Sequence, residues 1–219
     1  MIKADTVIKS KRKTLSVSVD THGRVIVRAP KHYTDRQINN ALAGSQEWIL
    51  KQLKKYEETK EKTNGLGIAD GKSVLLLGEK FVVRFADVKK EIIEGRTITL
   101  PKDNPEECLK KLLRRMAKNF FTERAALYSD ITGFTPSSVK VTSAKTRWGS
   151  CSAEKNICFS LSLIMCPLDV ADYVIVHELC HIKYMNHSAL FWNEVGKYIP
   201  DYKEKRKWLN NNRYIMDLI

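Results

Sequence analysis

The chain has 219 residues, of which 43% are hydrophobic and 29% are charged, a composition typical of a soluble protein with a buried core. The apolar runs are too short to span a membrane, and the first residues contain no hydrophobic signal segment. The five cysteines are odd in number and form no CxxC pair, which argues against a disulfide framework and a cysteine-rich zinc site. We therefore expect a cytoplasmic protein with no membrane partner.

Basic residues are in clear excess. Lysine and arginine number 38 against 25 aspartates and glutamates, so the formal net charge is +13. A surplus of this size favours a polyanionic partner without proving one. The basic residues concentrate in residues 2–31, with smaller patches in 110–118 and 203–207. No nucleic-acid-binding motif accompanies them, and solvated helix and strand faces account for most of the charge.

Residues 1–100 are predicted to form a β-rich region with one helix. Residues 14–19 and 24–28 alternate between apolar and polar side chains, and the residues between them have the composition of a turn. The apolar spacing becomes helical after Thr34, which can cap the helix. Residues 56–71 are charged and then contain glycine, which predicts a connector. Three further short strands are predicted at residues 74–77, 80–85 and 96–100.

Residues 101–219 are predicted to form a second domain. A helix starts at Pro105 and ends near Thr132, because apolar residues recur at helical spacing opposite a basic face. Two strands are expected at residues 139–144 and 157–163, followed by helices at 168–184, 188–198 and from 201 onward. Strands and helices do not alternate regularly, so the order predicts an α+β fold.

The segment from His177 to His181 has the pattern H-E-x-x-H within a predicted helix. Histidines four residues apart lie on nearly the same face of a helix, so both imidazoles can bind one metal ion. Glu178 is rotated away from that face by about one residue. It can therefore take a proton from a metal-bound water without displacing a ligand. This pattern predicts a hydrolytic metal centre with Glu178 as the catalytic base.

A catalytic zinc site usually has three protein ligands, and His187 is the candidate for the third. We expect Asn186 to adopt a left-handed conformation and Ser188 to cap the next helix, so that the chain turns and brings His187 back to the metal. Imidazole ligands and the absence of a hard-oxygen cluster favour Zn²⁺, with Mn, Co or Ni as substitutes. Zinc would lower the pKa of its bound water, and Glu178 would pass the proton to the leaving amine.

Several segments occur together in a fixed order: Arg147-Trp-Gly-Ser-Cys151, Ile157-Cys-Phe-Ser-Leu161, Tyr173 to His181, Asn186-His-Ser188 and Phe191-Trp192. In this combination the sequence resembles the YgjP-like metallopeptidase family, which is related to the SprT-like proteins and to other zincins. The resemblance implies a zincin-like catalytic part, in which the active-site helix packs on a small antiparallel or mixed sheet. It also implies that the zinc ligands are His177, His181 and His187 and that the base is Glu178.

Other residues near the motif have two interpretations each. Arg147 and Trp148 either line the cleft or pack beneath the active-site helix. Tyr184 and Tyr198 are candidate oxyanion donors that the sequence does not separate from ordinary helix-face tyrosines. The strand at 157–163 either pairs with an extended peptide substrate or lies inside a sheet.

The leading hypothesis is a zinc metallopeptidase that acts on a peptide or protein substrate. A second hypothesis keeps the metal but has the basic cleft bind a nucleotide, with hydrolysis of a nucleoside triphosphate or another phosphoanhydride. A third makes the chain a nucleic-acid-associated binding module with a structural metal. The presence of Glu178 argues against the third, since a structural metal site has no need of a base.

Overall fold

The computed structural model describes residues 2–20 and 22–218. The chain divides into two compact units, Met1–Asn64 and Gly65–Ile219. The boundary therefore falls within the segment predicted as a connector and not at residue 100. The physical reason is that the strands between residues 73 and 101 share a hydrophobic core with the catalytic part, to which they contribute Val74, Leu76, Val83, Ile98 and Leu100.

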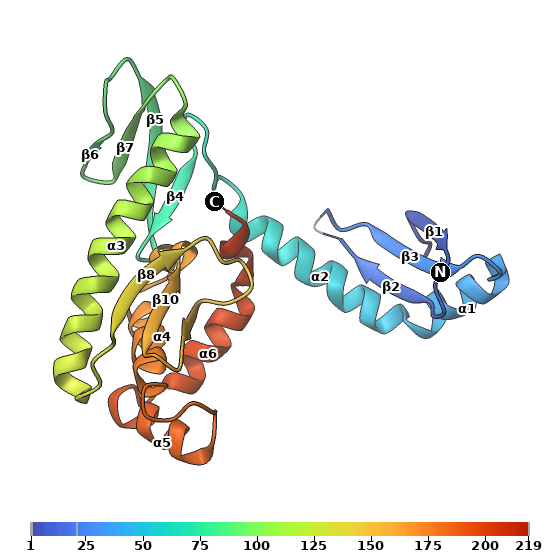
Figure 1. Ribbon diagram of the computed structural model, residues 1–219. Coiled ribbons are helices and arrows are strands. Elements are labelled where there is room, and N and C mark those ends of the chain that lie inside the picture. The colour runs from blue at the N-terminus through green and yellow to red at the C-terminus, as the bar shows by residue number, and fades with distance from the viewer. Residues whose placement is uncertain (1, 21, 219) are drawn as a thin grey trace. The chain divides into compact units, whose positions relative to one another are not determined.

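The N-terminal unit is a three-stranded sheet with two helices (Figure 1). Its strands are β1 (Thr6–Ser10), β2 (Ser16–Val19) and β3 (Val25–Pro30), and its helices are α1 (Asp35–Gly44) and α2 (Gln46–Thr63). The central strand β3 runs parallel to β1 and antiparallel to β2. Alternate side chains of a strand point to opposite faces, so one face of β3 enters a small core. That core consists of Val25, Val27, Ala29, Ile38, Leu42 and Ile49.

The helical part of this unit differs from the prediction in two ways. Thr34 caps α1 as predicted, and its side chain and that of Gln37 form a reciprocal capping box. The expected single helix, however, is broken at Ser45 into α1 and α2. In addition, α2 continues to Thr63, so much of the predicted connector is helical.

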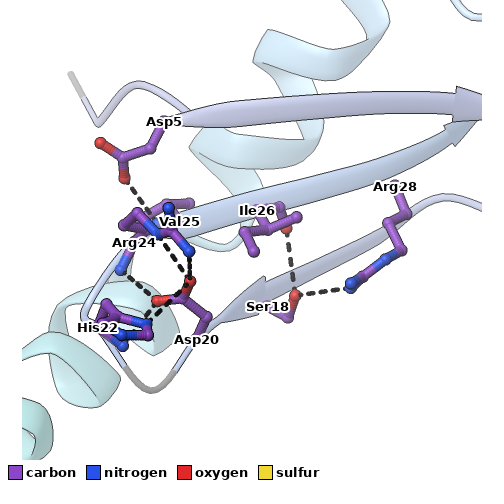
Figure 2. Close-up of polar contacts among 8 residues, drawn as sticks. All are labelled: Asp5, Ser18, Asp20, His22, Arg24, Val25, Ile26 and Arg28. Carbon is purple, nitrogen blue, oxygen red and sulfur yellow. Dashed lines mark hydrogen bonds and ion pairs between the residues drawn. The ribbon is translucent and has the colours of Figure 1, made fainter.

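The turn between β2 and β3 is held by the Asp20 carboxylate (Figure 2). Asp20 accepts hydrogen bonds from the backbone N–H groups of His22 and Arg24, at 2.9 Å each, and from the Arg24 side chain. Gly23 has a φ of +75°, and a Cβ at this position would lie 2.6 Å from the Tyr56 ring, so glycine is required for both reasons. The sequence correctly predicted the turn, but not the contact with Tyr56.

The second unit contains two sheets joined by a long helix (Figure 1). The first sheet has the order β4-β5-β7-β6, with β4 (Ser73–Leu76), β5 (Glu79–Ala86), β6 (Ile92–Glu94) and β7 (Thr97–Pro101). Helix α3 (Pro105–Thr132) has the predicted bounds, with Pro105 in its first turn and Gly133 in the left-handed conformation after its last residue. It contacts both β7 and β8, so its buried face joins the two sheets into one core.

The second sheet has the order β8-β10-β9, with β8 (Ser138–Thr142), β9 (Gly149–Cys151) and β10 (Asn156–Ser160). Strand β10 is parallel to β8 and antiparallel to β9, so both of its edges are occupied. Of the two interpretations of residues 157–163, the interior strand is therefore correct, and its last residues belong to the 3₁₀ helix η1 (Leu161–Met165). Strand β9, at one edge of this sheet, contacts the helix that contains the H-E-x-x-H motif.

The remaining elements are α4 (Leu168–Cys180), α5 (Ala189–Tyr198), α6 (Tyr202–Asn211) and the 3₁₀ helix η2 (Arg213–Asp217). Helix α4 packs against α3, α5, α6 and β9, which places it at the centre of the unit. The predicted α+β fold is confirmed, with the active-site helix packed against a small mixed sheet. None of the helices within the described residues is both long and apolar enough to cross a membrane.

Candidate metal centre and its cleft

The two histidines of the H-E-x-x-H motif lie at the C-terminal end of α4. His177 is in the last turn, and His181 directly follows the final helical residue. The helix therefore ends at Cys180 and not near residue 184 as predicted. Asn186 does not adopt the left-handed conformation that was expected to reverse the chain. The reversal is made by turns immediately after α4, and the Ser188 side chain then caps α5 by accepting a hydrogen bond from the next turn, as predicted.

The reversed chain brings the third histidine back to the first two. The Nε2 atom of His187 lies 3.1 Å from that of His177 and 3.2 Å from that of His181. A tetrahedral ion bound at Zn–N distances of about 2.0–2.1 Å needs nitrogen ligands about 3.3 Å apart. These histidines form a group that could hold a metal ion. The two distances from the His187 Nε2 atom are close to this spacing.

The protonation states also suit a metal site. Burial lowers the pKa of all three imidazoles, and for His177 it lowers the value to about 3. The Nδ1–H of His181 donates to the backbone carbonyl of Tyr184 at 2.9 Å, which leaves the lone pair on Nε2 facing the other histidines. Neutral imidazoles with converging lone pairs are the form of histidine that binds metals.

Aromatic side chains of α5 support the three histidines. The Phe191 ring is fully buried, and its centroid lies 4.8 Å from that of His177, 4.4 Å from that of His181 and 4.9 Å from that of His187. The Trp192 indole is stacked on His187, with a centroid distance of 5.4 Å and an interplanar angle of 20°. Helix α5 therefore fixes the orientation of the imidazole rings by packing.

The Glu178 side chain is buried between α4 and β9, with 5% of its surface exposed. Burial raises the pKa of Glu178 to about 8, and the charge of Arg147 opposes this rise. Gly149 lies directly against the carboxylate, because a Cβ built there would be 2.6 Å from Glu178 Oε1. Because Gly149 has no side chain, β9 leaves the space that the Glu178 carboxylate occupies.

A cleft of about 230 Å³ opens beside His177 and Glu178. Its lining consists of Arg147, Trp148, Gly149, Tyr173, Val174, His177, Glu178, Arg206, Leu209 and Asn210. Arg147 and Trp148 therefore both line the cleft, while Trp148 also packs against the hydrophobic core. This places the first two residues of the Arg147-Trp-Gly segment next to the predicted base.

The two candidate oxyanion tyrosines lie elsewhere. Tyr184 contributes its backbone carbonyl to the orientation of His181, and its ring packs beside the ammonium group of Lys183. The Tyr198 hydroxyl donates to Glu194 Oε1 at 3.2 Å and lies 3.5 Å from the Thr132 carbonyl oxygen. Neither tyrosine is part of the cleft lining.

Sequence reasoning missed two residues of the cleft that matter for its chemistry. Gly149 was visible within the Arg147-Trp-Gly segment, but its contact with Glu178 joins residues 29 positions apart. Arg206 was visible only as one charge in the basic patch of residues 203–207, and the packing of α6 against α4 brings it into the cleft. Neither contact has a periodic or local signal in the sequence.

The sequence matches the family model "YgjP-like, metallopeptidase domain" over residues 13–212. No curated protein matches the chain. A solved structure with similarity to it is the crystal structure of the metallopeptidase zymogen of Pyrococcus abyssi abylysin, which is 23% identical. That alignment covers 42% of this chain and 95% of the other, with a TM-score of 0.39.

Proposed function

Because the chain belongs to the YgjP-like metallopeptidase family, we propose that it hydrolyses peptide bonds with one zinc ion held by His177, His181 and His187. The convergence of the three Nε2 atoms, at 3.1 and 3.2 Å, carries this proposal. A set of three imidazoles suits zinc and leaves a coordination position for water or substrate. A zinc ion at this position supplies Lewis-acid activation of a water molecule and of the substrate carbonyl.

Glu178 is the general base and then the general acid. It lies beside His177 in the same cleft and carries a carboxyl group whose pKa is raised to about 8. A carboxyl group held beside the metal ligands can both accept and return a proton. Glu178 would take the proton of the attacking water and deliver it to the leaving amine. Gly149 and the surrounding core hold the carboxylate in place for both transfers.

A second candidate function is the hydrolysis of a phosphoanhydride such as that of a nucleoside triphosphate. The observation that favours it is the pair Arg147 and Arg206 in the cleft lining, since guanidinium groups bind phosphate as well as carboxylate. The metal ligands and the base would be the same. Family membership makes peptide hydrolysis the first choice.

The test compares the wild type with Glu178→Gln and His187→Ala, each examined for bound metal and for hydrolysis of a quenched fluorescent peptide library and of ATP. We expect about one zinc per chain in the wild type and in Glu178→Gln, and a loss of zinc in His187→Ala. Loss of general acid–base catalysis should slow Glu178→Gln by a factor of about 10² or more. A wild type that binds no metal, or a fully active Glu178→Gln, would refute the proposal. Hydrolysis of ATP by the wild type without hydrolysis of any peptide would favour the second function.

A further inference from the structure

The cleft beside the metal centre contains two arginines, and the charge of one of them, Arg147, acts on the buried Glu178. Arg147 and Arg206 are both exposed and both line the cleft. Within residues 2–20 and 22–218, no carboxylate forms an ion pair with either of them. The lining contains one acidic side chain, that of the buried Glu178. The open part of the cleft is therefore positively charged.

Arg206 is positioned by aromatic packing. Its guanidinium lies over the Trp192 ring, 5.0 Å from the ring centroid. The same indole stacks on His187 and also on Tyr202, with a centroid distance of 5.2 Å and an interplanar angle of 13° for the tyrosine. A guanidinium held on an aromatic face loses less freedom when it binds an anion than one on a free side chain. The Trp192 ring therefore contacts both Arg206 and the third histidine, His187.

Arg147 is positioned by the loop that leads into β9. The carbonyl of Thr146 accepts a hydrogen bond of 3.2 Å from the side chain of Arg213, which ties this loop to η2. Two residues after Arg147, Gly149 is packed against Glu178. The backbone next to Arg147 is therefore held on both sides, while its own side chain remains available for a ligand.

We propose that Arg147 and Arg206 form a subsite for a carboxylate group of the peptide substrate. This inference rests on the proposed function and names the chemistry that the cleft selects. A planar guanidinium binds a carboxylate through two parallel hydrogen bonds, and unmodified peptides offer carboxylates as their anionic groups. The carboxylate comes either from an aspartate or glutamate side chain near the scissile bond or from the free C-terminus of the substrate.

The experiment uses matched fluorescent peptides that differ in one glutamate or glutamine, each made with a free or an amidated C-terminus. Their binding to zinc-loaded, full-length Glu178→Gln is measured by anisotropy, which requires no turnover. A charged hydrogen bond should make each carboxylate peptide bind about tenfold more tightly than its neutral counterpart. The glutamate and C-terminal arms separately identify the source of the carboxylate. Wild-type hydrolysis of the same peptides is measured in parallel.

Arginine variants show whether this preference arises in the proposed subsite. Arg147→Ala and Arg206→Ala, made in the Glu178→Gln background, should each reduce the affinity ratio, and the double variant should bring it close to one. Arg206→Lys keeps the charge but loses the paired hydrogen bonds, so it should retain part of the ratio. Lys207→Ala is the matched control, since it removes one exposed charge from the same helix but lies outside the cleft lining. Zinc content and circular dichroism verify the fold of each variant.

The outcomes separate the subsite from the proposed function. A ratio near one in the parent protein would overturn the subsite. A preference that persists in the double variant would also overturn it, because the carboxylate would then bind elsewhere, for example on the zinc ion. If the arginine-dependent ratio is found but the wild type hydrolyses none of the peptides, the subsite is supported and the peptidase function fails.

Discussion

The contact between Gly149 and Glu178 makes a specific prediction for Gly149→Ala. A Cβ at this position would lie 2.6 Å from Oε1, 2.7 Å from Cγ and 2.9 Å from Cδ of Glu178. These three distances are all shorter than normal van der Waals contacts, so the Glu178 side chain or β9 must move. The φ angle of Gly149 is not positive, so alanine would not be strained by its backbone conformation. The perturbation is therefore almost purely steric and acts on the predicted base.

The expected effect is a loss of catalysis greater than the loss of metal or stability. Normal contact requires a separation of about 3.4 Å or more between these atoms, so relief of the overlap needs a shift of several tenths of an ångström to nearly 1 Å. Misplacement of a catalytic group by about 1 Å costs about 10² in rate, which corresponds to about 2.7 kcal/mol. Overpacking adds about 1–3 kcal/mol of destabilisation. The histidines are not displaced, so zinc content should stay near that of the wild type.

The assay measures kcat and KM for peptide hydrolysis, zinc content and thermal unfolding for Gly149→Ala and for a matched control, Gly196→Ala. Gly196 lies in α5, and the added Cβ would lie 3.5 Å from the Tyr202 ring of α6, an ordinary contact. That control should therefore be active and equally or more stable, since alanine favours a helix. Wild-type kcat in Gly149→Ala, or a fall in activity that only follows lost zinc, would refute the positioning of Glu178 by Gly149.

Two further predictions concern stability. The Arg124 Nε–H donates to Asp172 at 2.8 Å and so joins α3 to α4, and Asp172 is only 7% exposed. Asp172→Ala leaves the arginine charge without its partner, so it should lower the free energy of unfolding, measured with urea, by about 3 kcal/mol. The exposed pair of Lys111 and Glu107 is the control, and Glu107→Ala should lower the free energy of unfolding far less than Asp172→Ala does; equal losses would contradict the prediction. Hydrogen bonding, chiefly from the backbone of Arg24, lowers the pKa of Asp20 from 3.8 to about 2. The ionised Asp20 carboxylate therefore stabilises the fold above pH 3.8, and this stabilisation is lost as the pH falls through about 2. NMR titration of the His22 and Arg24 amides in the full chain should show a midpoint near 2 that disappears in Asp20→Asn, whereas a midpoint near 3.8 would show that these bonds do not form.

The sequence by itself determined the elements with strong local signals. The bounds of α3 follow from its apolar period and from Pro105 at its start. The spacing of His177 and His181 along α4 places them on one helix face, because the helical repeat fixes neighbours four residues apart. The start of α1 at Thr34 and that of α5 at Ser188 follow from side-chain caps, which are also local interactions.

Other features depended on contacts between residues distant in the sequence. The sequence could not place the unit boundary at Asn64, because the strands after it contribute to the second core only when the chain is folded. The local signal of Asn186 was misleading, and the turns after α4 together with Phe191 place His187 instead. The tertiary structure alone decided that Gly149 touches Glu178 and that Arg206 faces the cleft. In each case the side chains meet through packing between elements, for which the sequence has no period or spacing.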